Sequence, residues 1–265
     1  MKTIKERLVE HYNEALQYFP EDRIVGIFLQ GSQNYGLDTE RSDVDTKLIV
    51  VPSFEDICLN RKPVSTTHIR ENNEHIDFKD IRLYMETFRK QNLNFLEILF
   101  TNYYIINPMY QEQWNRLVAA REQIAHMNPY RAVKSMKGIA AEKYYAMEHP
   151  YPSKLELLEL FGYDGKQVSH LLRVDDYLKR YIDGDTYEHC LIPSPHRRPR
   201  IMDYKNQEIS LETARLEAKE VFDHTVALAD AFCERYEDKE DPEMRALLED
   251  VSYNIMKIST TKEIL

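Results

Sequence analysis

Hydrophobic positions in the first part of the chain predict a helix followed by two strands. Apolar residues recur at helical intervals over residues 3–18, which favours an amphipathic helix that ends at Pro20. The apolar run Ile24–Leu29 is short and rich in branched side chains, so it predicts a buried strand that Gly31 and Ser32 close. A second strand is expected over Val44–Val51.

The next residues predict a hairpin and then helices. Val64–Arg70 and His75–Phe78 flank a polar tetrapeptide, which is typical of two antiparallel strands. Asp80 is placed to cap a helix that runs to about Lys90, and a short helical stretch follows over Asn94–Phe100.

From about residue 106 onward the pattern is almost entirely helical. Helices are expected over 110–125, 130–148, 153–161, 165–183, 210–237 and 242–258. The change of pattern predicts an α+β fold, with a mixed-sheet core at residues 1–105 and an all-helical domain at residues 106–265. We expect the second domain to close a cleft against the first.

Composition favours a soluble globular protein of the reducing cytoplasm. The chain has 265 residues and 43% hydrophobic residues, enough to bury a core, and no apolar run approaches the roughly 20 residues that a membrane span needs. The start of the chain lacks the apolar segment of a signal peptide. Its three cysteines, Cys58, Cys190 and Cys233, form no zinc or disulfide pattern. We therefore expect no membrane association.

Net charge argues against loose binding to bulk DNA or RNA. The formal charge of -10 at pH 7 opposes binding driven by phosphates, although it permits one local basic cleft. The densest basic run is His196–Arg200. A solvated loop is the favoured interpretation of this run, with phosphate binding as the alternative.

Two aspartates at the start of the second strand point to a metal. In a strand, alternate residues share a face, so Asp43, Asp45 and Lys47 should point one way. Two carboxylates at adjacent positions of one face repel each other, and a cation between them would relieve this. Oxygen ligands without sulfur or imidazole suit Mg²⁺ or Mn²⁺. Most isolated S-D-x-D sequences only cap turns, so the neighbouring turn matters.

The Gly-Ser turn before these aspartates suits a phosphate chain. Gly31 would let the backbone approach a ligand closely, and Ser32 adds a hydroxyl donor. If a helix begins after the turn, its free N–H groups would face an anion. Gly36 would permit the return toward the second strand.

A third carboxylate is expected from the following hairpin. Asp77 lies between Ile76 and Phe78, which should face the core, so it should point to the opposite side. Glu74 and Asp80 are nearby competitors for this role, and a helix cap is the favoured interpretation of Asp80. Three carboxylates that hold two ions would match two-metal phosphoryl transfer, with Asp77 as the proton acceptor.

These residues resemble the nucleotidyltransferases of the DNA polymerase β superfamily. The match is closer to a bacterial and phage branch that includes RNA-repair-associated, RlaP-like nucleotidyltransferases: G-S-x-x-Y-G at Gly31–Gly36, S-D-x-D at Ser42–Asp45, and N-x-x-L-E-x-L-F near Asn92–Phe100. The branch often continues with Leu-Arg-Gly, where this chain has Thr46-Lys47-Leu48. The resemblance implies nucleotide binding by Gly31, Ser32, Tyr35, Ser42 and Lys47.

A third patch of resemblance lies in the helical part. Gly162–Arg173 is similar to the branch's G-Y-D-x-K-x-x-x-H-x-x-R segment. Lys166, His170 and Arg173 follow helical spacing, so they share one face, which could bind a triphosphate or a base. The alternative is a solvent-facing basic stripe paired with Asp175 or Asp176.

Together these features predict a nucleotidyltransferase that uses two Mg²⁺ or Mn²⁺ ions held by Asp43, Asp45 and Asp77. The reaction would move a nucleoside monophosphate from a nucleoside triphosphate to a hydroxyl acceptor and release pyrophosphate. The acceptor stays open: an RNA end such as that of tRNA, a side chain of a partner protein, or a second nucleotide. A non-catalytic module that senses nucleoside triphosphates is the alternative on the same fold.

Overall fold

The computed structural model describes residues 2–40 and 42–264, which form an α+β protein with two compact units. Unit 1 comprises residues 1–127 and 240–265, and unit 2 comprises residues 128–239. Among the described residues, no helix is long and apolar enough to cross a membrane.

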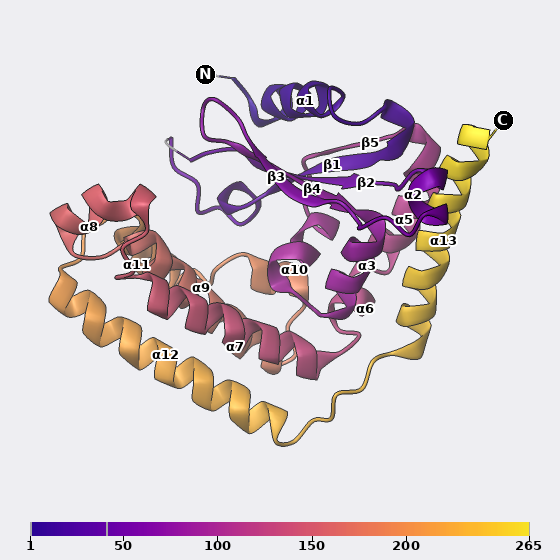
Figure 1. Ribbon diagram of the computed structural model, residues 1–265. Coiled ribbons are helices and arrows are strands. Elements are labelled where there is room, and N and C mark those ends of the chain that lie inside the picture. Colours follow the sequence, from indigo (N-terminus) through magenta and orange to yellow (C-terminus); the bar gives the residue numbers. More distant parts are fainter. Residues whose placement is uncertain (1, 41, 265) are drawn as a thin grey trace. The chain divides into compact units, whose positions relative to one another are not determined.

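Unit 1 is built on a mixed five-stranded sheet in the order β3-β4-β2-β1-β5 (Figure 1). Its strands are β1 (Ile24–Gln30), β2 (Asp45–Val50), β3 (Ser65–Ile69), β4 (His75–Asp80) and β5 (Tyr104–Ile106). The predicted strands and the predicted hairpin are confirmed. Neighbouring strands are antiparallel except for β2 and β4, which run parallel because the chain crosses over between them through α2 (Phe54–Cys58) and β3.

Helix α1 (Ile4–Ala15) covers one face of this sheet. A capping box between Thr3 and Glu6 starts the helix by satisfying the N–H groups at its N-terminus. Its apolar side chains pack on the inward positions of the sheet, in a core that contains Leu8, Ala15, Ile24, Ile27, Leu48, Val50, Ile76 and Phe78. Burial of these side chains is the main force that holds α1 on the sheet.

The opposite face of the sheet is covered by short helices. These are α3 (Ile81–Arg89), α4 (Leu93–Leu96) with the 3₁₀ turn η3 (Glu97–Leu99), and α5 (Gln111–Ala119); α6 (Arg121–Ala125) packs on α3 and α5. Asp80 caps α3 by accepting a hydrogen bond from the Arg82 N–H at 2.9 Å, as predicted. Trp114 of α5 stacks on Phe28 of β1 with ring centroids 4.3 Å apart.

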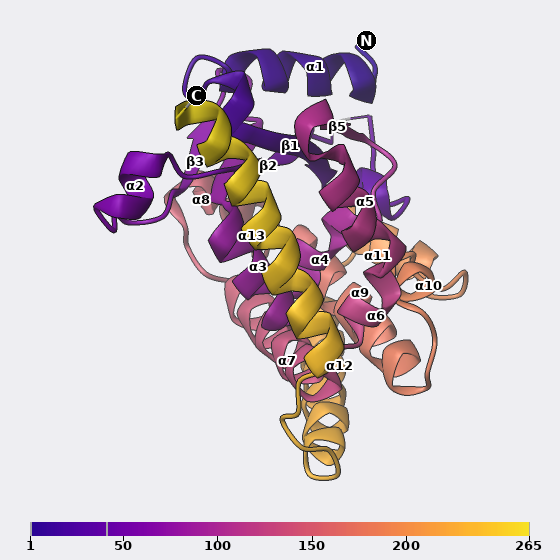
Figure 2. The same ribbon diagram turned by 90° about the vertical axis from the view of Figure 1, so that its right-hand side faces the viewer.

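The last helix, α13 (Pro242–Ile264), belongs to unit 1. It lies along α3 and α5 (Figure 2), and Glu263 accepts a hydrogen bond from the Phe54 N–H at 2.8 Å. The compact units thus differ from the expected domains. Residues 106–127 and 240–264 belong to the unit that contains the sheet, because α5, α6 and α13 bury their apolar faces there.

Unit 2 is entirely helical among its described residues. Its helices are α7 (Pro129–Ala146), α8 (Leu155–Phe161), α9 (Gly165–Ile182), α10 (Tyr187–Leu191), α11 (Arg198–Lys205) and α12 (Leu211–Cys233). Helix α9 is the centre of this unit, since almost all its residues from Val168 to Leu178 are buried and α7, α11 and α12 pack against it. The basic run at 196–200, expected as a loop, instead leads into α11, where Arg200 pairs with Glu217.

Candidate active site

The turn after β1 is a single turn of 3₁₀ helix. Gly31 has a φ of 99°, which a side chain would disfavour, and Ser32–Asn34 follow it. Asn34 fastens the turn, because its side chain donates to the Leu29 carbonyl at 3.0 Å and accepts from the Thr101 hydroxyl at 2.7 Å. The Gly31 N–H donates to the Glu97 carboxylate at 2.9 Å. The turn is therefore fixed from two sides.

The two aspartates stand next to this turn. Gln30, the last residue of β1, pairs with Asp45, the first residue of β2. Asp43 is exposed, Val44 is buried and Asp45 is half-buried, so the expected alternation of the two carboxylates with a core residue is present. The Gln33 side chain donates to the Asp43 carbonyl at 2.7 Å and links the turn to the start of β2.

A buried glutamate and its neighbour hold this strand start in place. The Glu74 carboxylate, 0% exposed, accepts from the Val44 N–H at 2.8 Å, and its other partners are Arg7, His11, Arg70 and Asn72. The His75 N–H donates to Asp45 Oδ1 at 2.9 Å. Because its oxygens already serve these partners, Glu74 is a structural anchor and not a competitor for the third carboxylate.

Asp77 lies on β4, in register with Lys47 on β2. Its side chain therefore lies on the same face of the sheet as the side chains of Lys47 and Asp45. Along the strand direction it is level with Lys47, two residues beyond Asp45. The Thr67 hydroxyl donates to Asp77 Oδ1 at 2.5 Å. Asp77 is thus half-buried on the predicted face, with one oxygen already in use.

Lys47 is buried beneath this face, with only 3% of its surface exposed. Its ammonium donates to the Asn94 carbonyl and lies 4.1 Å from the centroid of the Phe95 ring. Burial lowers the pKa of Lys47 to about 8, although the carboxylates of Glu97 and Asp77 oppose this shift. Lys47 therefore has partners inside the protein, and contact with a phosphate would require it to leave them.

Tyr35 and Ser42 support the loop between the two strands. Tyr35 is 4% exposed and packs in the core. The Ser42 hydroxyl accepts a hydrogen bond from the Thr39 N–H at 2.9 Å, which fixes the chain just before Asp43. In this conformation both side chains shape the loop.

The three residues of the predicted basic face lie on α9 in unit 2. Lys166 is exposed, His170 is half-buried and Arg173 is 2% exposed. Burial, followed by the positive charges of Arg173 and of lysines 143, 166 and 205, holds the pKa of His170 well below its ordinary value. Asp175 and Asp176, the alternative partners of this stripe, bond instead to other residues: Arg197, His224 and Thr225 for Asp175, and Arg180 and Ser194 for Asp176. A shared cleft with Asp43 and Asp45 stays a prediction.

Carboxylate oxygens are the type of ligand that a hard cation such as Mg²⁺ prefers. Asp43, just before β2, and Asp45, its first residue, are carboxylates close in sequence, and Asp45 pairs with Gln30, the residue before Gly31. Over residues 2–40 and 42–264, however, no group of three or more His, Cys, Asp or Glu side chains is gathered at metal-binding separation. Asp43 and Asp45 are the predicted ligands next to the Gly31 turn, whereas Asp77 lies on β4 in register with Lys47.

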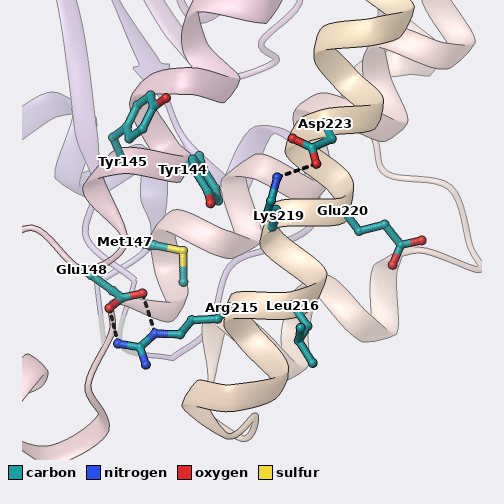
Figure 3. Close-up of a pocket in the computed structure, with 9 residues that line it drawn as sticks. All are labelled: Tyr144, Tyr145, Met147, Glu148, Arg215, Leu216, Lys219, Glu220 and Asp223. Carbon is teal, nitrogen blue, oxygen red and sulfur yellow. Dashed lines mark hydrogen bonds and ion pairs between the residues drawn. The ribbon is translucent and has the colours of Figure 1, made fainter.

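A cavity lies elsewhere, between α7 and α12 of unit 2, with a volume of about 810 Å³ (Figure 3). Figure 3 shows its rim of ion pairs: Arg215 binds Glu148 through two hydrogen bonds, and Lys219 binds Asp223. Tyr144 and Tyr145 line its wall. The cavity contains no residue that the sequence motifs predict.

Glu97 is a site residue to which the sequence reasoning gave no role. It contacts the Gly31 N–H and its charge acts on Lys47, so it joins the turn to the buried lysine. The sequence signal for Glu97 is its place in the segment Asn92–Phe100, whose resemblance to the family implies no particular role for the glutamate.

Comparisons with known proteins add little to this geometry. No family model and no curated protein matches the chain. A nucleotidyltransferase-like protein from Exiguobacterium sibiricum 255-15 is similar in structure, with a TM-score of 0.33 and 12% sequence identity over 86% of this chain and 75% of that chain. A similarity this low supports no conclusion about activity.

Proposed function

We propose that the protein is a metal-dependent nucleotidyltransferase that transfers a nucleoside monophosphate from a nucleoside triphosphate to a hydroxyl acceptor. The main support is one juxtaposition: the Gly31 turn and the aspartates 43 and 45 lie at the paired ends of β1 and β2. A glycine turn can approach phosphate oxygens, and paired carboxylates can hold the cation that accompanies them.

In this proposal Asp43 and Asp45 bind Mg²⁺ or Mn²⁺. The cation, when bound, would neutralise charge on the phosphates and favour departure of pyrophosphate. Ser32 and the backbone of the turn would hold the β- and γ-phosphates. These roles agree with the exposure of Asp43 and the half-exposure of Ser32.

Asp77 is the proposed proton acceptor. The acceptor hydroxyl would lose its proton to the Asp77 carboxylate while its oxygen forms a bond to the α-phosphorus. The bond from the α-phosphorus to the bridging oxygen would then break, and pyrophosphate would leave with that electron pair. The hydrogen bond from Thr67 would keep Asp77 oriented for this transfer.

A label-transfer assay tests the proposal. Protein is incubated with α-labelled nucleoside triphosphates, Mg²⁺ or Mn²⁺ and whole-cell extract, and the products are separated as protein, RNA and small molecules. The variant Asp43→Ala/Asp45→Ala should transfer no label. Asp38→Asn is a matched control, because Asp38 is an exposed aspartate of the same loop with Leu37 buried beside it.

The distribution of label identifies the acceptor class. Label in the protein, RNA or small-molecule fraction would assign a side chain, an RNA end or a second nucleotide. Equal labelling by the double variant would refute the roles of Asp43 and Asp45. If wild-type protein binds nucleoside triphosphate and metal but no fraction is labelled, the non-catalytic sensor is the better description.

A further inference from the structure

The groove between α7 and α12 has an apolar wall that solvent reaches (Figure 3). Tyr144, Tyr145 and Met147 contribute to this wall from the end of α7, and Leu216 contributes from the second turn of α12. Tyr145 and Leu216 are each 69% exposed. Tyr144 lies parallel to Phe222 of α12 with ring centroids 4.5 Å apart, so this stack fixes one side of the groove. The groove is therefore held in shape while it leaves large apolar groups in water.

The end of α8 adjoins this groove and adds further exposed apolar groups. The Asp164 N–H donates to the Met147 carbonyl at 2.7 Å, so the residues after α8 meet the end of α7. The backbone at Gly162, which ends α8, is so close to the start of α12 that a Cβ there would lie 2.7 Å from the Leu211 side chain. Leu160 is 70% exposed. Exposed apolar side chains from three helices thus lie near one meeting point, which is typical of a surface that binds another protein.

The free charges around this surface are negative. Both cations that line the groove are held by carboxylates, because Arg215 binds Glu148 at 2.6 and 3.0 Å and Lys219 binds Asp223 at 2.7 Å (Figure 3). Within the described residues, three exposed carboxylates of α8 and of the groove form no ion pair: Glu156, Glu159 and Glu220. The surface therefore combines apolar side chains with unneutralised negative charge.

This charge decides which kind of molecule the surface suits. RNA or an anionic membrane would bring phosphates against the carboxylates. A second copy of the chain in a two-fold contact would place the same carboxylates opposite one another. A helix that is apolar along one face and basic beside it matches both features of the surface. Its apolar face would cover Tyr145 and Leu216, and its Lys or Arg side chains would meet the carboxylates.

We propose that the groove between α7 and α12, together with the end of α8, docks a basic amphipathic helix of a partner protein. Lys or Arg of the partner also gains from the exposed ring of Tyr145, because a cation is attracted to the face of an aromatic ring. Glu220 is the groove carboxylate that is ready to pair with it. This docking site uses none of the residues proposed for nucleotidyl transfer, so it stands or falls separately from that function.

Binding of a synthetic peptide to the whole protein tests this proposal. The probe is a fluorescein-labelled helix of about 18 residues built from leucine and lysine, with the leucines at helical spacing along one face. Its twin carries glutamate in place of every lysine. Fluorescence anisotropy should show that the lysine peptide binds at least about 10-fold more tightly than the glutamate peptide. Leu216→Ala and Glu220→Lys should each weaken binding of the lysine peptide about 10-fold.

Two variants outside the surface are matched controls. Leu59→Ala removes an exposed leucine at the end of α2 in unit 1. Glu234→Lys makes the same change of charge as Glu220→Lys at the far end of α12, about 21 Å further along the helix. Both should bind the lysine peptide like wild type. Circular dichroism checks that all four variants keep their helix content, as the exposure of the substituted residues predicts.

Three results of the peptide titration would overturn the proposal. These are no binding of the lysine peptide, equal binding of the two peptides, or affinities of Leu216→Ala and Glu220→Lys that match those of the controls. Sedimentation velocity of the protein alone supplies a fourth. A dimer that Leu216→Ala dissociates would show that a second copy covers the surface in place of a basic helix.

Discussion

The buried ammonium of Lys47 should make unit 1 more stable as the pH rises above neutrality. Burial lowers the pKa of Lys47 from 10.5 to about 8 in the folded protein. Between these values the unfolded chain binds a proton that the folded chain has lost, so stability increases with pH across this window. At neutral pH the charged form costs roughly 3 kcal/mol relative to an exposed lysine.

The variant Lys47→Met removes this cost, but it also removes the donor to the Asn94 carbonyl. An unsatisfied carbonyl costs about 1–3 kcal/mol, so the variant should be at least nearly as stable as wild type at neutral pH. From about pH 7 to about pH 9.5, wild type should gain roughly 2 kcal/mol relative to the variant.

Urea unfolding followed by tryptophan fluorescence measures this effect on the stability of unit 1, which contains Lys47. Trp114 is the single tryptophan and contacts Phe28 of β1, so its emission reports on the sheet. Lys90→Met, which removes an exposed ammonium at the end of α3, is the control. A stability difference between wild type and Lys47→Met that is constant over this pH range would refute the reasoning.

Three other predictions follow from the same unit. His11 is buried, and burial together with Arg70 lowers its pKa to about 4. Between about pH 6.5 and pH 4 the unfolded chain takes up a proton at this position and the folded chain does not, so the free energy of unfolding of wild type should fall by up to about 3 kcal/mol. In urea titrations, His11→Gln should reduce this loss. Glu97→Ala removes the acceptor of the Gly31 N–H and should lower label transfer about 10-fold or more. Glu97→Gln keeps an acceptor and should recover most of the transfer. Equal activity of wild type and both variants would exclude a role for this contact. Asp80→Ala removes the cap of α3 and should cost about 1 kcal/mol or more in thermal unfolding without a specific effect on transfer.

Local signals in the sequence predict strands β1 to β4 and most of the long helices. The apolar run of β1 and the alternation around Ile76 and Phe78 correspond to the buried positions of the sheet. The cap at Asp80 was predicted because capping depends on adjacent residues alone. Strand β5 was missed because three residues carry no period, and its pairing with β1 is a long-range contact.

The environment of the site depended on contacts that no local pattern carries. The alternation of residues predicts that Lys47 shares a face with Asp45. It does not predict that Asn94 and Phe95 bury the Lys47 ammonium. Glu74 was close to Asp77 in sequence and equally acidic, and only the positions of α1 and β3 show that it is enclosed by basic residues. The return of α13 to unit 1 likewise has no signal in its own amphipathic pattern.

Paramagnetic mapping with Mn²⁺ tests most directly whether the turn and the aspartates form one site. Amide signals are recorded for wild type and for Asp43→Ala/Asp45→Ala, with Mn²⁺ alone and with Mn²⁺ and a non-hydrolysable nucleoside triphosphate. We predict that substoichiometric Mn²⁺ first broadens the signals of residues 43–46 and that the nucleotide extends the effect to residues 31–34. The double variant should lose both effects. Broadening centred away from these residues, or unchanged in the double variant, would contradict the account.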